Sequence, residues 1–205
     1  MVHDKHHWYD GWFYDKIIAP HQEKLFGQIK DLIEPDSSVI DVGCGTGRLA
    51  FTIAGKCKSV LGIDLSERNI NRAKWILGQK PNAKIAFKNS NLTETINGGD
   101  AYFDYAVLTY VIHEVDKYQR FDLLADAASV AGKIIVADYL VPGPGDFSGW
   151  LSEVIEFIAG IEHYRNYKSY MENGGIHHLA NKAGLKIINE ISTQTSTNHI
   201  LILSK

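Results

Sequence analysis

Hydrophobic positions along the chain follow two periods. Short apolar runs of β character predict five strands, at residues 39–42, 59–63, 84–87, 103–108 and 133–139. Apolar residues at helical spacing predict helices between them, at residues 12–34 (interrupted at Pro20), from residue 47 to about 54, and at 66–77 and 117–130. Strands that alternate with helices indicate βαβ units, so we expect a mostly parallel sheet.

The last third of the chain departs from this alternation. Its pattern predicts helices at residues 147–159 and 177–183, then strands at 185–191 and 199–203. The polar link over 192–198 is too short for a crossover, so the two strands form an antiparallel hairpin. We therefore expect an α/β fold with a seven-stranded, mostly parallel sheet, an antiparallel hairpin at its C-terminal end and helices on both faces.

Composition narrows the class of protein without identifying it. A chain of 205 residues with 45% hydrophobic and 22% charged residues fits one globular domain with a substantial core. The formal net charge of −3 gives no general basic field for nucleic acid. Two cysteines make no disulfide framework, and we see neither a signal peptide nor a transmembrane segment. These features predict a cytoplasmic enzyme or binding protein.

A glycine-rich loop carries most of the functional information. Gly43, Gly45 and Gly47 lie between a strand and a helix, in G-x-G-x-G spacing rather than the G-x-G-x-x-G of dinucleotide binders. Asp41 would repel a pyrophosphate but suits the cationic groups of S-adenosylmethionine (SAM). Asp64 ends the next strand, where a carboxylate can accept both ribose hydroxyls. The alternative is a plain tight turn with Asp64 as a helix cap.

Four segments resemble the motifs of class I SAM-dependent methyltransferases. Residues 39–47 are similar to the first SAM motif, 62–66 to the second, 103–109 to the fourth-strand motif, and 112–115 to the segment that follows it in many small-molecule members. The resemblance is to quinone- and lipid-biosynthesis and type 11 methyltransferases. It implies a Rossmann-like fold and a single domain over residues 1–205, with an N-terminal helical cap (1–36) and an inserted lid (143–176).

The resemblance also assigns cofactor contacts. The glycines would line the methionine part of SAM, Asp41 and the end of the fourth strand would approach its amino group, Asp64 would hold the ribose, and Leu65 would cover the adenine. The third-strand motif usually carries Asp near the adenine; this chain has Asn91, whose carbonyl accepts the same bond. The residues predicted to bind SAM, or S-adenosylhomocysteine (SAH) as product, are Asp41, Gly43, Cys44, Gly45, Thr46, Gly47, Asp64, Leu65, Asn91, Leu92, Leu108 and Thr109. We interpret Cys44 as a small loop residue, not a nucleophile.

Catalytic candidates come from loops after the strands and from the inserted segment. His113 follows the fourth strand, and His163 and Tyr164 lie in a His-Tyr-Arg-Asn-Tyr run that suggests a pocket lid or a solvated corner. Asp138 and Tyr139 end the fifth strand and either border the acceptor or form a buried hydrogen bond. An aromatic, His-rich stretch over residues 3–14 either covers the cofactor or packs on the sheet. We predict no metal site, because neither this stretch nor His177–His178 has a carboxylate or cysteine at ligand spacing.

The sequence leaves several functions open. The leading interpretation is methyl transfer from SAM to a small-molecule acceptor by in-line displacement, in a monomer or homodimer. An RNA or protein methyltransferase is a second interpretation, although no basic stretch and no Asn-Pro-Pro-Tyr-type motif is present. A non-catalytic SAM-binding protein is a third and a nicotinamide-binding protein a fourth. The acceptor and the methylated atom stay undetermined.

Overall fold

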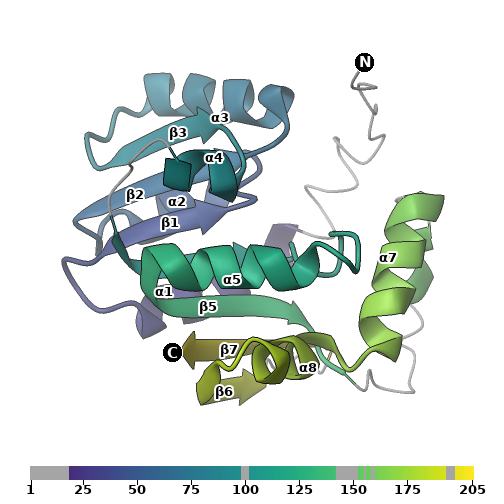
Figure 1. Cartoon of the computed structure of the whole chain (residues 1–205). Coiled ribbons are helices and arrows are strands. Elements are labelled where there is room, and N and C mark those ends of the chain that lie inside the picture. Colours follow the sequence, from purple (N-terminus) through teal and green to yellow (C-terminus); the bar gives the residue numbers. More distant parts are fainter. Residues whose placement is uncertain (1–18, 98–101, 142–151, 155, 158–159, 193–196) are drawn as a thin grey trace.

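The computed structural model describes residues 19–97, 102–141, 152–154, 156–157, 160–192 and 197–205. Within them a seven-stranded sheet has the order β3-β2-β1-β4-β5-β7-β6 (Figure 1). Its strands are β1 (Ser38–Val42), β2 (Ser59–Asp64), β3 (Ile85–Asn89), β4 (Phe103–Thr109), β5 (Ala131–Tyr139), β6 (Lys186–Ser192) and β7 (Asn198–Ser204). The first five are parallel, and β7 runs antiparallel to both β5 and β6. The predicted fold class, including the C-terminal hairpin, is confirmed.

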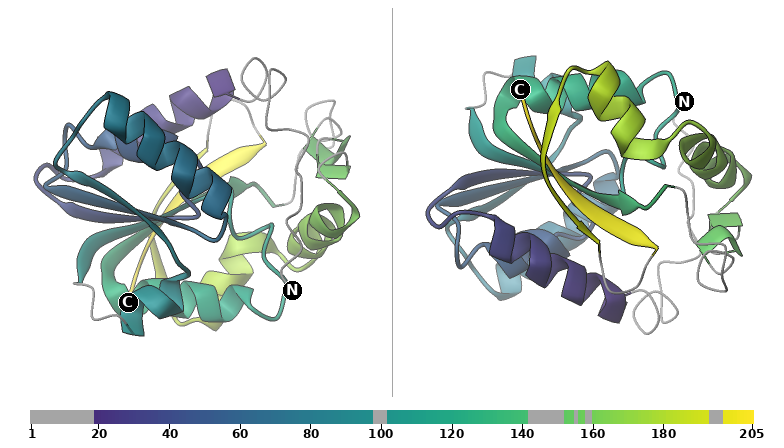
Figure 2. Two further views of the ribbon diagram at one scale, coloured as in Figure 1. Left: turned by 90° about the horizontal axis from the view of Figure 1, so that it is seen from above. Right: turned by 90° about the horizontal axis from the view of Figure 1, so that it is seen from below.

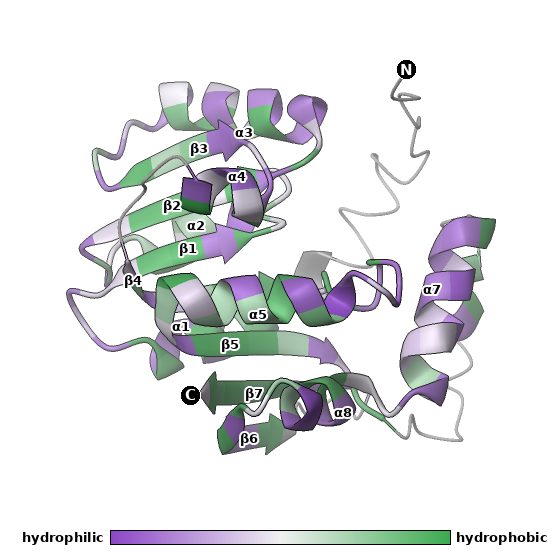
Figure 3. Cartoon of the chain, viewed as in Figure 1, coloured by the Kyte–Doolittle hydropathy of each residue, from purple (hydrophilic) through white to green (hydrophobic). Residues whose placement is uncertain are grey.

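Helices cover both faces of the sheet (Figure 2). The helices are α1 (Ala19–Leu32), α2 (Arg48–Ile53), α3 (Glu67–Gln79), α4 (Leu92–Asn97), α5 (Arg120–Val130), α7 (Ile161–Glu172) and α8 (Gly175–Lys182). Apolar side chains of α1, α2 and α3 pack on one face, and those of α4, α5, α7 and α8 on the other. Strands β5 and β7 are almost uniformly apolar, whereas the helices alternate between hydrophilic and hydrophobic residues (Figure 3), as expected for a sheet buried on both faces.

Some predicted element boundaries need correction. Pro20 lies in the first turn of α1, where its missing N–H costs nothing, and the part of the predicted helix before residue 19 lies outside the described residues. Helix α3 continues through Gly78 to Gln79, although Ser66 caps it as predicted. The sequence pattern missed α4, which is only six residues long, and α7. The aromatic stretch at residues 3–14 lies outside the described residues.

The strand order reverses between β1 and β4. The chain goes from β1 outward to β2 and β3, then returns to place β4 on the other side of β1. In open α/β sheets, ligands bind at the carboxyl ends of the strands beside such a switch point. The loops after β1 and β4 are therefore the first place to look for a site. No helix in the described part of the chain has the length and apolarity to cross a membrane.

Gly62 is a position where the close approach of two strands excludes a side chain. A Cβ atom added there would lie 2.6 Å from the ring of Phe87 on β3 and 2.9 Å from the sulfur of Cys44. We expect Gly62→Ala to lower the free energy of unfolding by about 1–3 kcal/mol, the usual cost of overpacking. Urea denaturation measures this change. Gly55→Ala, where a Cβ meets open space, is the matched control and should change stability little; equal losses in both variants would contradict the steric explanation.

Candidate functional site

The glycine turn after β1 has a backbone that few other residues could adopt. Gly43, Gly45 and Gly47 have φ angles of 69°, 54° and 83°, in the left-handed region that favours glycine. A Cβ on Gly43 would collide with Val111, and one on Gly47 with the ring of Phe87. A Cβ on Gly45 would meet no atom within 4 Å. Gly45 thus borders open space at the switch point, where a ligand can approach the backbone closely.

Asp41, two residues before the turn, is a buried carboxylate with unused hydrogen-bonding capacity. Its side chain is 2% exposed, and Oδ2 has no partner among the described residues. Burial, reinforced by the nearby charge of Asp64, raises the pKa of Asp41 to about 7. The hydroxyl of Thr109, at the end of the adjacent β4, is also buried and without a partner. These two orphaned oxygens are suited to an ammonium group, so the residues present fit the methionine end of SAM.

Asp64 links β2 to the glycine turn. Its Oδ2 accepts a hydrogen bond from the N–H of Gly45 (2.8 Å), and its Oδ1 accepts one from the N–H of Ser66 (2.8 Å). Because Ser66 itself caps α3 through a bond from Asn69, Asp64 is not the cap residue. Each carboxylate oxygen keeps lone pairs for a further donor such as a ribose hydroxyl.

Only some of the side chains predicted to lie near an adenine are free to contact a ligand. The side chain of Leu65 is 77% exposed beside Asp64 and can cover an apolar ring. Asn91 uses its carbonyl oxygen to accept a bond from the N–H of Glu94 (2.7 Å), at the start of α4. Since a carbonyl has two lone pairs, this capping leaves one for a second donor. Leu92 is buried, so its side chain belongs to the core.

Three other predicted cofactor residues contribute in different ways. Leu108 is fully buried in the core, so only its backbone can face a ligand. Burial raises the pKa of the Cys44 thiol, which keeps it protonated and unreactive. Thr46 lies half-buried within the turn. The raised pKa supports the interpretation of Cys44 as a small loop residue and not a nucleophile.

His113 is the centre of a buried polar network beside the glycine turn. Its Nδ1 lies 2.7 Å from Oδ1 of Asp138, and its Nε2 lies 3.5 Å from Oε1 of Glu156. Tyr139 donates its hydroxyl to the same oxygen of Glu156 at 2.8 Å. Oδ2 of Asp138 accepts the backbone N–H groups of Ile112 and His113. The strand-end hydrogen bonds considered for Asp138 and Tyr139 are therefore present, and they hold His113.

The charges around His113 set its protonation. Burial alone would lower the pKa of this imidazole, but the carboxylates of Asp138 and Glu156 outweigh it, so the pKa lies well above 6.5. The pKa of Glu156 is lowered: its burial opposes ionisation, and hydrogen bonding to His113 overcomes that cost. At neutral pH the cluster holds an imidazolium between two carboxylates.

Tyrosine rings surround His113 on several sides. Ring centroids lie at 4.9 Å for Tyr139 and at 6.4–6.5 Å for Tyr110, Tyr167 and Tyr170. Tyr110 has a φ angle of 56°, a strained value for a non-glycine residue that is frequent at functional sites. The result is an aromatic enclosure contributed by the residue after β4, by β5 and by α7.

Of the two catalytic candidates predicted on α7, only one lies near His113. His163 lies 4.0 Å from the carboxylate of Glu114, which follows His113. Tyr164 instead donates its hydroxyl to Glu153 and packs edge-on against Phe157. The structure thus brings His163 toward the His113 loop, but not Tyr164.

The sequence analysis did not choose Tyr167, Tyr170, Glu156 or Arg120 as site residues, although Tyr167 lies within the predicted lid run. Tyr167 and Tyr170 are buried against His113, three residues apart on one face of α7; a helical reading of residues 161–172 would have found that pair. Glu156 has no sequence signal of its own. Arg120 was missed as well: it is buried and ties α7 to the His113 loop by donating to the carbonyls of Val115, His113 and Asn166.

Comparisons with known proteins agree with the fold and the loop. A family profile described as a methyltransferase domain matches residues 39–133. The chain is 26% identical over 153 residues to the O-methyltransferase cnsE of Penicillium expansum, covering 73% of this chain and 52% of the relative. It is 34% identical over 85 residues to the ubiquinone biosynthesis O-methyltransferase of Rickettsia typhi, covering 42% of this chain and 33% of that relative. The chain therefore spans about half the length of the first relative and a third of the second.

Solved structures resemble the whole chain more evenly. The magnesium protoporphyrin IX methyltransferase of Synechocystis PCC 6803 with bound SAH has a TM-score of 0.67 and 18% identity, covering 95% of this chain and 88% of that one. At 18% identity this structural similarity shows a shared fold and nothing about the substrate.

Proposed function

We propose that this chain, which belongs to the class I SAM-dependent methyltransferases, transfers a methyl group from SAM to an oxygen atom of a small-molecule acceptor bound beside His113. Its sheet, its glycine turn and the matching methyltransferase domain support the donor. The names of the relatives cited above, both O-methyltransferases, favour an oxygen acceptor.

The donor would lie across the carboxyl ends of β1, β2 and β4. The unpartnered Oδ2 of Asp41 would accept the ammonium group of the methionine part, and open space at Gly45 would admit its chain. Asp64 would accept the ribose hydroxyls and Leu65 would cover the adenine. When bound, SAM supplies an activated methyl group on a sulfonium with a good neutral leaving group, so alignment and exclusion of water are the main tasks of the protein.

The observation that carries the acceptor side is the position of the aromatic enclosure. Val111 packs against the first glycine of the donor turn, and His113 follows it two residues later. The loop that contacts the donor turn therefore also carries the enclosed imidazole. Tyrosine rings around it suit a flat, hydroxylated acceptor, and an imidazole can take the hydroxyl proton. Because His113 starts as an imidazolium, it would act as a base only after losing its proton, so turnover should rise with pH above 6.5.

A ligand-binding experiment tests the donor assignment first. At 100 times the dissociation constant, a ligand stabilises a chain by about 2.7 kcal/mol, which for about 200 residues corresponds to a rise in Tm of roughly 5–10 °C. We expect SAM and SAH to produce such a rise, and NAD⁺ to produce none. A shift with NAD⁺, or no shift with SAM and SAH, would refute the donor assignment.

Turnover then separates the candidate acceptors. Methyl-labelled SAM is incubated with hydroxylated aromatic compounds, with bulk RNA and with an unmodified protein extract. We expect label in the first group only. Label in RNA or protein would favour a macromolecular methyltransferase, and donor binding without label in any group would favour a SAM-binding protein that does not catalyse methyl transfer.

A further inference from the structure

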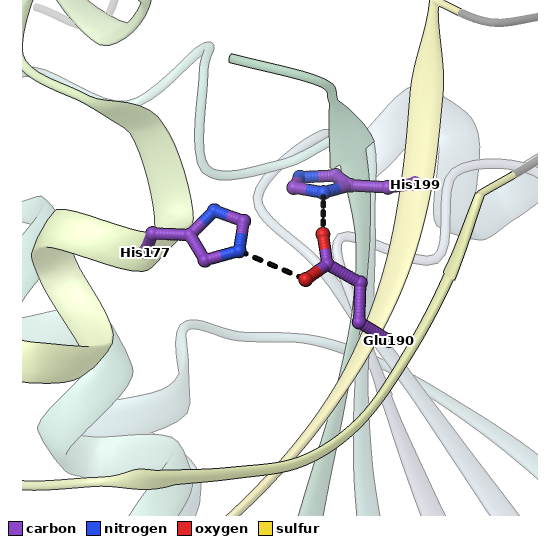
Figure 4. Close-up of side chains that lie close together, drawn as sticks. All are labelled: His177, Glu190 and His199. Atoms are coloured by element: carbon purple, nitrogen blue, oxygen red, sulfur yellow. Dashed lines mark hydrogen bonds and ion pairs between the residues drawn. The ribbon is translucent and has the colours of Figure 1, made fainter. Parts of the chain in front are cut away.

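Three side chains converge where α8 faces the C-terminal hairpin, and none of them belongs to the proposed donor and acceptor sites (Figure 4). Nε2 of His177 lies 3.0 Å from Oε2 of Glu190, and Nδ1 of His199 lies 2.9 Å from Oε1 of the same carboxylate. One potential metal-ligating atom from each residue lies within 4.8 Å of the others. Two nitrogen atoms and a carboxylate therefore face a common point.

The fold explains why residues so far apart in sequence meet. Glu190 on β6 pairs with Leu201 on β7, two residues beyond His199, so Glu190 and His199 project from the same face of the hairpin. Helix α8 packs on that face through Leu179 and Ala180, and His177 in its first turn completes the group. The sequence analysis predicted no metal because it searched for ligand spacing along the chain; here the spacing exists only in three dimensions.

We propose that His177, Glu190 and His199 form a binding site for a divalent transition metal ion of the zinc class. Two imidazoles and one carboxylate are a ligand set that zinc accepts. Tetrahedral zinc bonds of about 2.0–2.2 Å place ligand atoms about 3.3–3.6 Å apart. The separations here, from 2.9 Å to an upper limit of 4.8 Å, bracket that distance. Small side-chain rotations would bring all three ligands onto one ion.

The site is partly open to solvent, so an ion can enter it and water can be the fourth ligand. His177 and Glu190 are 39% and 36% exposed, whereas His199 is 1% exposed. Solvent can therefore reach the open coordination position, and His199 supplies an anchor inside the protein. Since His199 lies opposite Asp138 of β5 in the strand register, a bound ion would brace α8 and the hairpin against the strand that holds His113. This role is structural, and donor binding does not depend on it.

Zinc titration of the untagged 205-residue chain tests the site. The variants are His177→Ala and Glu190→Gln, with His178→Ala as matched control because His178 is the exposed neighbouring histidine on the same helix. We expect wild type and His178→Ala to bind one more zinc ion per chain than His177→Ala. Loss of a ligand should weaken binding about 100-fold or more, at least the cost known for outer-shell partners. Counting by difference removes any contribution from the histidines at positions 3, 6 and 7.

Spectroscopy and stability distinguish a metal site from a hydrogen-bonded cluster. Co²⁺ in the wild-type chain should show the strong visible bands of tetrahedral coordination, and His177→Ala should lose them. Zinc should raise the Tm of wild type and His178→Ala only, while the Tm shift produced by SAH stays the same in all variants. Equal zinc stoichiometry in His177→Ala and His178→Ala, or cobalt spectra that do not differ between them, would overturn the proposal.

Discussion

Replacing Asp41 by asparagine is expected to weaken SAH binding by about 2–3 kcal/mol, or roughly 30- to 150-fold. The carboxylate is buried and its Oδ2 has no partner, so an arriving ammonium group would gain a charged hydrogen bond that water does not compete for. An asparagine oxygen offers the same position without the charge. SAH is the appropriate probe because it lacks the sulfonium, which leaves the amino group as its cation. Isothermal titration calorimetry measures the change.

The pH dependence makes this prediction more specific. In the free chain the pKa of Asp41 is about 7, so below pH 7 the ammonium group must first displace a proton. We expect the affinity of wild type for SAH to fall up to tenfold per pH unit below 7, and Asp41→Asn to show no such dependence. A variant that binds SAH as tightly as wild type, with the same pH dependence, would remove Asp41 from the site.

Stability supplies the control for Asp41→Asn. The carboxyl ionises near 3.8 when unfolded and near 7 when folded. The folded chain therefore binds this proton more tightly, and its stability falls as pH rises through that interval. Asparagine avoids the cost of the buried charge, so the ligand-free variant should melt at a higher temperature than wild type at pH 8 while gaining less from SAH. A variant that simply misfolds would melt lower.

Local patterns were enough to predict the sheet and the donor loop. Apolar runs located all seven strands, and in the central strands the continuous hydrophobic segments reflect burial on both faces. The glycine turn was visible because left-handed backbone angles demand glycine at Gly43 and Gly47. These features depend on neighbours in sequence, and a single chain contains that information.

The acceptor side depends on contacts that no local pattern records. Asp138 and His113 are 25 residues apart, and Glu156 approaches His113 from the segment after β5. Tyr164 and Tyr167 lie three residues apart on α7, yet only Tyr167 contacts the ring of His113, because Tyr164 lies nearly one turn closer to the start of the helix, where it bonds to Glu153. The sequence analysis named the right segment without its helix and so had no means to choose between them.

Replacing His113 by glutamine is expected to lower the free energy of unfolding by about 3–5 kcal/mol at neutral pH, the usual cost of leaving a buried charge without its partner. Asp138 and Glu156 would then face each other without an intervening cation. Urea denaturation measures the loss. In the double variant with Glu156→Gln one carboxylate is gone, so the combined loss should be smaller than the sum of the single losses. Strict additivity would contradict a shared network.

The sign of the pH dependence tests the charge of His113 independently. Its pKa is raised by folding, so the stabilisation is fully present below pH 6.5 and is lost as pH rises through the folded value. The difference in stability between wild type and His113→Gln should therefore shrink at alkaline pH. NMR of the His113 imidazole should show a pKa above 6.5. Asp138→Asn should lower that pKa because it removes the negative charge that stabilises the imidazolium most. In Asp138→Asn the lower pKa of His113 should also move the alkaline rise in turnover to lower pH, which would link the His113–Asp138 pair to removal of the acceptor proton. If the difference in stability between wild type and His113→Gln stays constant with pH, then His113 is neutral and this role as a base is wrong.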